Sequence, residues 1–270
     1  MPHRSKEQNY SRFIILGFIL LIVVLALLLG MKLCHKDKPQ SPVVKMVSQE
    51  AVVRDSIAYP LNYLLGKTSK EFIQVTDSRY AKLNLSLRPE TYKAFKMMYD
   101  AADSAGVSLK LLSGTRSWEK QRSIWENELT NLKYSASKPK AEKIKLIKDA
   151  LEYISLPGSS RHHWGTEIDI FSLNVSDWNK GDGKKAGDWL EKNAAKYGFY
   201  QAYTDPTIDG RKGFSYEPWH WSYKPLSQKM YQDLIAQVSY QDFKGFTGAE
   251  LCQDIDLINV YIKGINPALK

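Results

Sequence analysis

The chain has 270 residues, 43% of them hydrophobic, which is enough to bury the core of one large domain or two small ones. Its only cysteines are Cys34 and Cys252, which excludes a disulfide framework and a Cys-x-x-Cys metal site. The formal net charge is +9, and residues 1–45, with seven Lys or Arg against two acidic residues, carry +5 of it. This excess favours anionic lipid headgroups as its partner, and since no nucleic-acid-binding motif accompanies it, we expect no nucleic-acid ligand.

The first element along the chain is an apolar run at residues 13–31, FIILGFILLIVVLALLLGM, which contains neither a charge nor a proline. At about 1.5 Å per residue, its length matches the roughly 30 Å hydrocarbon layer of a membrane. We therefore predict a transmembrane anchor over residues 13–33, preceded by a short N-terminus over residues 1–12.

Two alternatives involve cleavage of this segment. The basic residues before the run would also suit a signal peptide, but the run is longer than the roughly 7–15 apolar residues of such a peptide, and no small-x-small cleavage site follows. A lipoprotein signal at Cys34 is disfavoured because the three residues before it, Met-Lys-Leu, are not small. Lysines follow the run as well as precede it, so the charges alone leave its orientation open.

The remaining chain predicts a linker, a domain and an extension. Residues 34–50 are rich in Lys and Pro and form the linker; a domain over residues 51–240 and a C-terminal helical extension over residues 241–270 follow. Apolar spacing and helix breakers predict helices over 89–105, 117–132, 144–154, 189–197, 226–239 and 249–263. Alternation and strand-forming residues predict strands over 107–111, 166–171, 199–203 and 214–223. Because unequal insertions separate the strands, we predict an α+β fold with a mainly antiparallel sheet and flanking helices.

Two motifs carry the candidate chemistry: Ser160 to Asp169, SRHHWGTEID, and Glu217 to His220, EPWH. Two imidazoles and one carboxylate are a suitable ligand set for a catalytic zinc, which keeps its fourth position open for water. His162 and Asp169 are seven residues apart, so they can meet only if a loop folds back onto the strand, and Gly165 permits that turn. His220 must then come from a strand adjacent in space.

Glu217 is the candidate general base. In an ideal strand, positions i and i+3 face opposite sides, so a bulge, a strong twist or a position before the strand would be needed to bring Glu217 and His220 to one metal. With zinc lowering the pKa of a water toward ~7, Glu217 would take the proton and later return it to the leaving amine.

These residues resemble the zinc D-alanyl-D-alanine carboxypeptidases of the VanY and L,D-carboxypeptidase type, whose fold is shared with the Hedgehog signalling domain. The family pattern Ser-x-His-x-x-Gly-x-Ala-x-Asp followed by Glu-x-x-His is matched at all but one of its fixed positions. The resemblance covers roughly residues 85–225 and includes the segment SGTRSWEKQ at residues 113–121.

The resemblance implies that His162, Asp169 and His220 hold Zn²⁺, that Glu217 is the base, and that Arg116, Ser160 and Gln121 bind the substrate. For Arg116 the chemistry agrees, because a guanidinium donates two parallel hydrogen bonds to a terminal carboxylate. A structural ion pair is the alternative for Arg116, and a purely polar supporting role is the alternative for Gln121.

One position departs from the pattern. Glu167 stands where the family usually has Ala, on the predicted strand face of Asp169. We expect Glu167 to accept a hydrogen bond from a ligand imidazole or to face solvent beside the site, with the substrate amine as another possible partner. His163, adjacent to a ligand, is expected at the polar rim rather than as a substitute ligand.

The resemblance implies an enzyme that removes the terminal D-Ala from peptidoglycan stem peptides. L,D-carboxypeptidase, peptidoglycan endopeptidase and a non-catalytic wall-binding module remain alternatives on the same fold. A cell-wall substrate would place the N-terminus in the cytoplasm and residues 34–270 on the outer side of a single-pass cell-membrane anchor.

Overall fold

The computed structural model describes residues 58–68 and 71–270, which belong to one compact unit, Val52–Lys270. The predicted N-terminus, anchor and linker at residues 1–12, 13–33 and 34–50 lie outside the described residues, as does Cys34. Among the helices of the described part, none has both the length and the apolar character that crossing a membrane requires.

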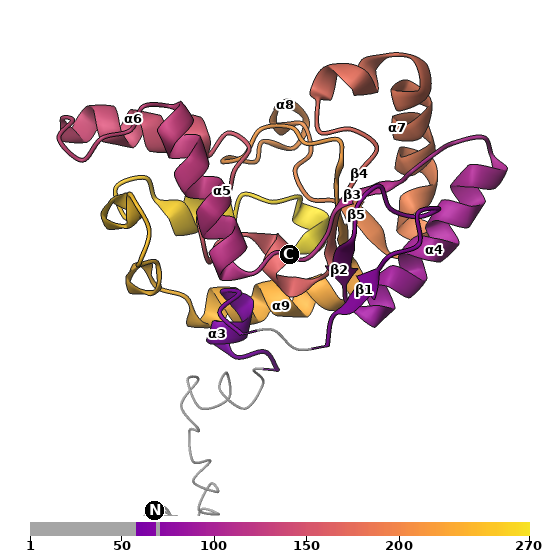
Figure 1. Cartoon of the computed structure of the whole chain (residues 1–270), viewed down its shortest axis with the longest axis horizontal. Coiled ribbons are helices and arrows are strands. Elements are labelled where there is room, and N and C mark those ends of the chain that lie inside the picture. Colours follow the sequence, from indigo (N-terminus) through magenta and orange to yellow (C-terminus); the bar gives the residue numbers. More distant parts are fainter. Residues whose placement is uncertain (1–57, 69–70) are drawn as a thin grey trace, which may run out of the picture. The chain divides into compact units, whose positions relative to one another are not determined.

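A four-stranded antiparallel sheet confirms the predicted α+β class (Figure 1). Its strands lie in the order β3 (Leu111–Ser113), β4 (Glu167–Ile170), β6 (His220–Tyr223) and β5 (Phe199–Gln201). The ladder between β4 and β6 places Asp169 opposite His220 and Glu167 opposite Ser222. Two rungs of this strand pair, separated by the Ile168–Trp221 rung, therefore carry four of the polar side chains that matter below.

One apolar cluster lies between the sheet and the helices α4 (Pro89–Ser104) and α7 (Gly181–Asn193). Ile168 and Ile170 of β4 are fully buried in it, against side chains such as Phe95 of α4 and Leu190 of α7. The alternation along β4 thus directs its isoleucines to this core and its two carboxylates to the opposite face, as the sequence predicts.

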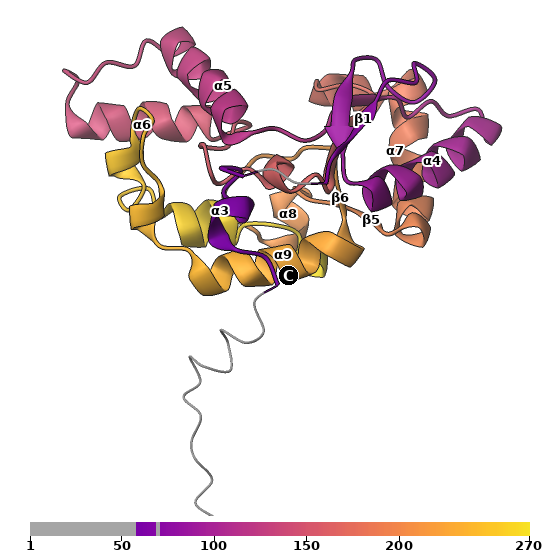
Figure 2. The ribbon, with the colours of Figure 1, turned by 60° about the horizontal axis from the view of Figure 1, so that its bottom comes forward.

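A second apolar cluster is built from α3 (Leu61–Leu64), α5 (Trp118–Asn131), α6 (Lys140–Ala150), α9 (Lys224–Gln237) and the C-terminal residues (Figure 2). The predicted extension, residues 241–270, contributes Phe246, Leu257 and Leu269 to it. Cys252 lies in the same cluster, 1% exposed, and has no disulfide partner among the described residues. Residues 241–270 therefore share their core with the rest of the compact unit.

The remaining elements are short. A small antiparallel hairpin joins β1 (Ile73–Val75) to β2 (Leu85–Leu87), and α8 spans Pro206–Asp209. The 3₁₀ turns are η1 (Arg161–Trp164), η2 (Val175–Asn179), η3 (Ala194–Tyr197), η4 (Tyr240–Asp242), η5 (Ala249–Leu251) and η7 (Pro267–Leu269), and η6 (Leu257–Ile262) is a π-helix. The predicted helix over 249–263 is therefore wrong as one element, because η5 and η6 are separate and Asp256 between them has a left-handed φ of 53°.

All four predicted strands are shorter than expected, and two of them begin well after their predicted first residue. The strand predicted over 107–111 begins only at Leu111, because β4 ends at Ile170 and the chain then turns at Phe171, which has a φ of 65°. The strand predicted over 214–223 begins at His220. Before it, Pro218 has no N–H to donate to a ladder, and the Arg211 guanidinium donates hydrogen bonds to loop carbonyls of Thr204, Phe214 and Ser215.

Candidate active site

Two strands and one 3₁₀ turn bring the three predicted metal ligands together. Asp169 and His220 are direct cross-strand neighbours on β4 and β6. His162 lies on η1, and Gly165 then turns the chain into β4 with a left-handed φ of 71°. A Cβ atom at Gly165 would lie 2.6 Å from the ring of Phe72, so glycine is required both for the backbone conformation and for space.

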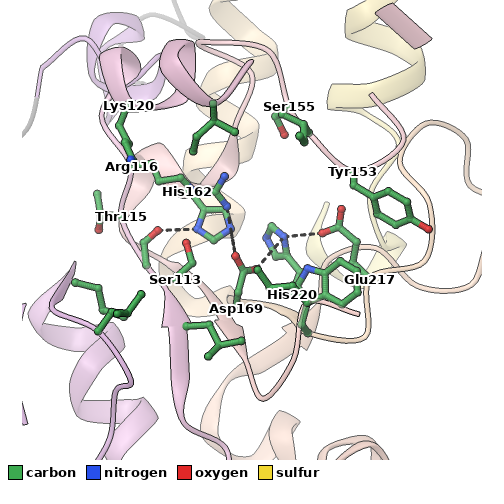
Figure 3. A pocket seen from close by; sticks show the side chains of 18 of the residues that line it. Ser113, Thr115, Arg116, Lys120, Tyr153, Ser155, His162, Asp169, Glu217 and His220 are labelled. Carbon is green, nitrogen blue, oxygen red and sulfur yellow. Dashed lines mark hydrogen bonds and ion pairs between the residues drawn. The ribbon is translucent and has the colours of Figure 1, made fainter. Parts of the chain in front are cut away.

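One potential ligand atom from each of His162, Asp169 and His220 lies within 4.8 Å of the other two (Figure 3). His162 Nε2 is 3.3 Å from Asp169 Oδ2, and His220 Nδ1 is 3.7 Å from Asp169 Oδ1. All three residues are at most 4% exposed. Among the described residues, His162 Nε2 and Asp169 Oδ1 have no hydrogen-bond partner. Buried polar atoms without partners need an explanation, and a cation held by two nitrogens and a carboxylate supplies one.

The environment of His162 leaves the correct nitrogen free. Its Nδ1 is 2.7 Å from the carbonyl oxygen of Gly114, so this nitrogen carries the proton and Nε2 keeps its lone pair. Burial, reinforced by the charge of Arg116, lowers the pKa of His162. A neutral imidazole with Nε2 directed at Asp169 is the form that binds a metal ion.

His220 lies between two carboxylates. Its Nε2 is 3.0 Å from Glu167 Oε2 and its Nδ1 is 3.1 Å from Glu217 Oε2. Burial opposes a charge on His220, but the bonds to Glu167 and Glu217 outweigh it and raise the pKa of His220 to about 9. Nδ1 is the nitrogen that faces Asp169, and it would be the ligand atom.

Glu217 reaches the site from the loop before β6, which resolves the geometry that the spacing left open. The peptide N–H of Glu217 donates to the Tyr203 carbonyl at 3.0 Å, and the N–H of His220 donates to the Glu217 carbonyl at 3.3 Å. This turn lets two side chains three residues apart converge. Burial raises the pKa of the Glu217 carboxyl, which the hydrogen bond to His220 partly offsets.

Arg116 lies in the loop after β3, on the other side of the predicted metal ligands from Glu217 (Figure 3). Its Nη2 is 3.4 Å from Asp169 Oδ2, its Nη1 donates to Gln121 Oε1 at 3.1 Å, and its Nε has no partner among the described residues.

Gln121 is fully buried and donates to the Ser155 carbonyl at 2.7 Å. Ser160, 2% exposed, lies directly before η1. Neither Gln121 nor Ser160 lines the cavity, so their contact with substrate stays a prediction.

A cavity of about 900 Å³ opens above these groups, lined by His162, Asp169, His220, Glu217 and Arg116 (Figure 3). Its outer wall is partly apolar. Leu83, Tyr153 and Leu173 are 67%, 46% and 56% exposed and line the cavity, as do Lys120 and Trp219. The cavity therefore has a charged floor and a hydrophobic rim.

The sequence matches the VanY family of D-alanyl-D-alanine carboxypeptidases over residues 84–226, more than half of the chain. The chain belongs to this family. The Bacillus subtilis protein YodJ is 32% identical over 184 residues, which cover 64% of this chain and 59% of YodJ. A D-alanyl-D-alanine carboxypeptidase of Enterococcus faecalis is 32% identical over 129 residues, covering 47% of this chain and 44% of that protein. The match thus spans about half the length of these relatives.

Among solved structures, a variant of the D,D-pentapeptidase VanY from a VanB-type cassette, in complex with Zn(II), is 24% identical. The similarity covers 61% of this chain and 81% of that one, with a TM-score of 0.45.

His163 of this VanY-family chain does not lie at the rim, and the expectation that it would is wrong. It is 2% exposed, its Nδ1 is 2.7 Å from the Arg116 carbonyl, and its Nε2 accepts the N–H of Gly158 at 3.1 Å. Burial lowers its pKa to about 4, so it is neutral. His163 ties the Arg116 loop to the segment before η1.

Two residues near the site were not singled out from the sequence. Arg161 pairs with Glu167, its Nη2 lying 3.1 Å from Glu167 Oε1, and both side chains are buried. Tyr203 stacks edge-on against His220, with 4.9 Å between ring centroids. The strand alternation placed Glu167 beside Asp169, but no spacing indicated its partner Arg161.

Proposed function

We propose that this VanY-family chain is a zinc-dependent D-alanyl-D-alanine carboxypeptidase that removes the terminal D-Ala from peptidoglycan stem peptides. The observation that carries the proposal is the convergence, on the floor of one cavity, of three metal-competent donors, a carboxylate and a guanidinium. His162, Asp169 and His220 would hold the ion. The orphaned Nε2 of His162 and Oδ1 of Asp169 support this assignment, because a cation would satisfy both.

When bound, zinc would acidify the attacking water and polarise the scissile carbonyl. Glu217 would take a proton from that water and pass it to the leaving amine of D-Ala. Its location supports this role, since Glu217 Oε2 lies 3.1 Å from the nitrogen through which His220 would bind the metal. Burial, which raises the pKa of Glu217, also suits a group that must both accept and donate a proton near neutral pH.

Arg116 would bind the carboxylate at the end of the substrate. Its Nε has no partner among the described residues, and its side chain, 21% exposed, lines the cavity. A guanidinium fixed at Nη1 by Gln121 has lost part of its freedom before the substrate arrives, so fewer degrees of freedom remain to be lost on binding. Recognition of a free carboxylate favours a carboxypeptidase over an endopeptidase.

The cavity supports a substrate longer than a free dipeptide. Its volume of about 900 Å³ is near the top of the range for small-molecule sites, roughly 300–1,000 Å³. Leu83, Tyr153 and Leu173 on its wall would cover apolar parts of the stem that precede the scissile bond.

The proposed substrate also gives a location. A transmembrane anchor at residues 13–33 would hold residues 34–270 on the outer side of the cell membrane, with the juxtamembrane lysines near anionic lipid. Protease added to intact spheroplasts should then cleave the domain. Protection of the domain in intact spheroplasts, with cleavage after lysis, would place it in the cytoplasm and remove this part of the proposal.

Digestion of defined stem peptides tests the activity. The full chain, purified in detergent and loaded with zinc, is incubated with a pentapeptide stem, a tetrapeptide stem and a cross-linked stem dimer, and the products are identified by mass. We expect D-Ala from the pentapeptide. Release from the tetrapeptide alone would make the protein an L,D-carboxypeptidase, and cleavage of the cross-link alone an endopeptidase. Bound zinc with no product from any substrate would leave a wall-binding module.

A further inference from the structure

Glu167 divides its two oxygens between different tasks. Oε1 accepts three hydrogen bonds, from Arg161 Nη2 at 3.1 Å, Ser222 Oγ at 2.7 Å and Thr166 Oγ1 at 3.0 Å. Oε2 is 3.0 Å from Nε2 of His220. The side chain is 0% exposed, so this carboxylate is held by protein groups alone.

The donors around Oε1 are themselves fixed. Ser222 is the cross-strand partner of Glu167, and its hydroxyl also bonds to Ser227 Oγ at 2.7 Å. The guanidinium of Arg161 donates to Ser222 Oγ at 2.7 Å and lies over the ring of Trp164, 4.6 Å from its centroid. This network determines where Oε1 must lie, and through the planar carboxylate it also determines where Oε2 points.

We propose that Glu167 is a positioning residue that holds His220 in the tautomer with the proton on Nε2, so that Nδ1 is the free metal ligand. The inference rests on the proposed function, since it assigns a task toward the zinc. The need for such a residue is visible in the site, because Glu217 lies 3.1 Å from Nδ1 and would otherwise favour a proton on that nitrogen. Hydrogen bonds to the second nitrogen of a ligand histidine generally set its tautomer and ring orientation.

Replacing Glu167 by Gln separates positioning from packing. The three donors around Oε1 would require the amide oxygen at that place, so the amide NH₂ would take the place of Oε2 and donate to Nε2 of His220. That reverses the tautomer and puts the proton on Nδ1. A residue that only fills space would tolerate the isosteric Gln better than Ala, whereas a positioning residue would make Gln at least as harmful as Ala.

The test measures zinc affinity of the full chain in detergent by competition with a chromophoric chelator, independently of peptidase activity. We expect Glu167→Gln to raise the zinc dissociation constant by about 10–100-fold and Glu167→Ala by no more than Glu167→Gln. Glu191→Gln, an exposed change of the same type on α7, is the matched control and should bind zinc like the wild type. Nitrogen NMR of the zinc-bound protein should show His220 protonated at Nε2 in the wild type and not in Glu167→Gln.

Loss of the buried partner of Arg161 could unfold the single variants. The double variant Arg161→Met with Glu167→Leu removes both charges and keeps apolar volume, and it should fold and still bind zinc about tenfold or more weakly. Wild-type affinity in the double variant, or in Glu167→Gln, would overturn the proposal. If instead the wild type and His162→Ala bind zinc equally, the metal site itself is wrong and the proposed function fails with it.

Discussion

Two carboxylates flank His220 at nearly the same distance, Glu217 at 3.1 Å from Nδ1 and Glu167 at 3.0 Å from Nε2, yet their surroundings differ in kind. Glu217 lines the cavity, and burial raises the pKa of its carboxyl. Glu167 does not line the cavity and is 0% exposed, so we call its side of the His220 ring the closed side and the side of Glu217 the open side. Burial alone would raise the pKa of Glu167 too, but the charge of Arg161 and the bond to His220 lower it to about 2.

The difference between the open and the closed side of His220 separates two tasks. A carboxylate with a raised pKa beside a water-accessible cavity can exchange a proton during a reaction. A carboxylate paired with a buried guanidinium stays ionised and can only accept hydrogen bonds. When the environments of two like groups move their pKa values apart, acid–base and supporting roles can be assigned from structure. The variants below test that assignment, beginning with the largest expected effect.

Removing the metal ion should abolish the proposed peptidase activity, because the roles of both Glu217 and Glu167 depend on the ion. We expect dialysis of the full chain against a chelator to eliminate D-Ala release from pentapeptide, and added zinc to restore it. His162→Ala should not recover with zinc, because two ligands remain where three are needed. Activity that survives complete metal removal, checked by elemental analysis, would show that the proton chemistry of Glu217 does not require the ion.

A change at Glu217, on the open side, should lower the catalytic rate and leave zinc binding unchanged. Glu217→Gln preserves the size of the side chain but cannot take a proton, so we expect kcat to fall by about 10²–10⁴-fold with the zinc dissociation constant unchanged. Glu191→Gln again serves as the exposed control. Loss of zinc affinity in Glu217→Gln would mean that Glu217 is a ligand and would remove the contrast with Glu167.

The sequence predicted the open side much better than the closed side. His162, Asp169, His220 and Glu217 belong to short motifs whose residue types are those that zinc and proton transfer require. Their convergence depended on one glycine, which local pattern indicates, and on the pairing of β4 with β6, which only the required ligand set implied. Spacing alone could not decide how Glu217 reaches the site, because the same sequence is compatible with a loop before β6 and with a bulged strand.

The closed side depends on contacts that no local pattern encodes. Ser222 bonds to Glu167 across 55 positions, and Gly158 and Arg116 bond to the two nitrogens of one histidine, His163, from separate loops. The identity of such partners follows from tertiary packing, which is why the sequence left Glu167 undecided and placed His163 at the rim. Helix bounds near regular apolar periods, such as α4 and α5, were by contrast predicted to within two residues.

Arg116 extends the comparison to substrate binding on the open side. Arg116→Lys keeps the charge but loses the fork that can hold a carboxylate with two hydrogen bonds. We expect KM for the pentapeptide to rise by roughly 10–100-fold, corresponding to about 1.5–3 kcal/mol for a hydrogen bond to a charged group. A substrate with its terminal carboxylate amidated should show little difference between Arg116→Lys and the wild type. An equal loss with the amidated substrate would assign Arg116 to the structure of the site instead.

The smallest effect on catalysis is expected at His163. Because His163 is adjacent to His162, the two alanine variants can be compared directly. His163→Ala would leave the buried Gly158 N–H and the half-buried Arg116 carbonyl without their partner, at about 1–3 kcal/mol for a buried unsatisfied group. Urea unfolding of the metal-free full chain should therefore show a lower midpoint for His163→Ala than for His162→Ala, whereas zinc affinity should change much less in His163→Ala. A larger loss of zinc affinity in His163→Ala than in His162→Ala would mean that His163 takes part in holding the ion. The comparison is direct because the two adjacent imidazoles are equally buried and differ in what their nitrogens face.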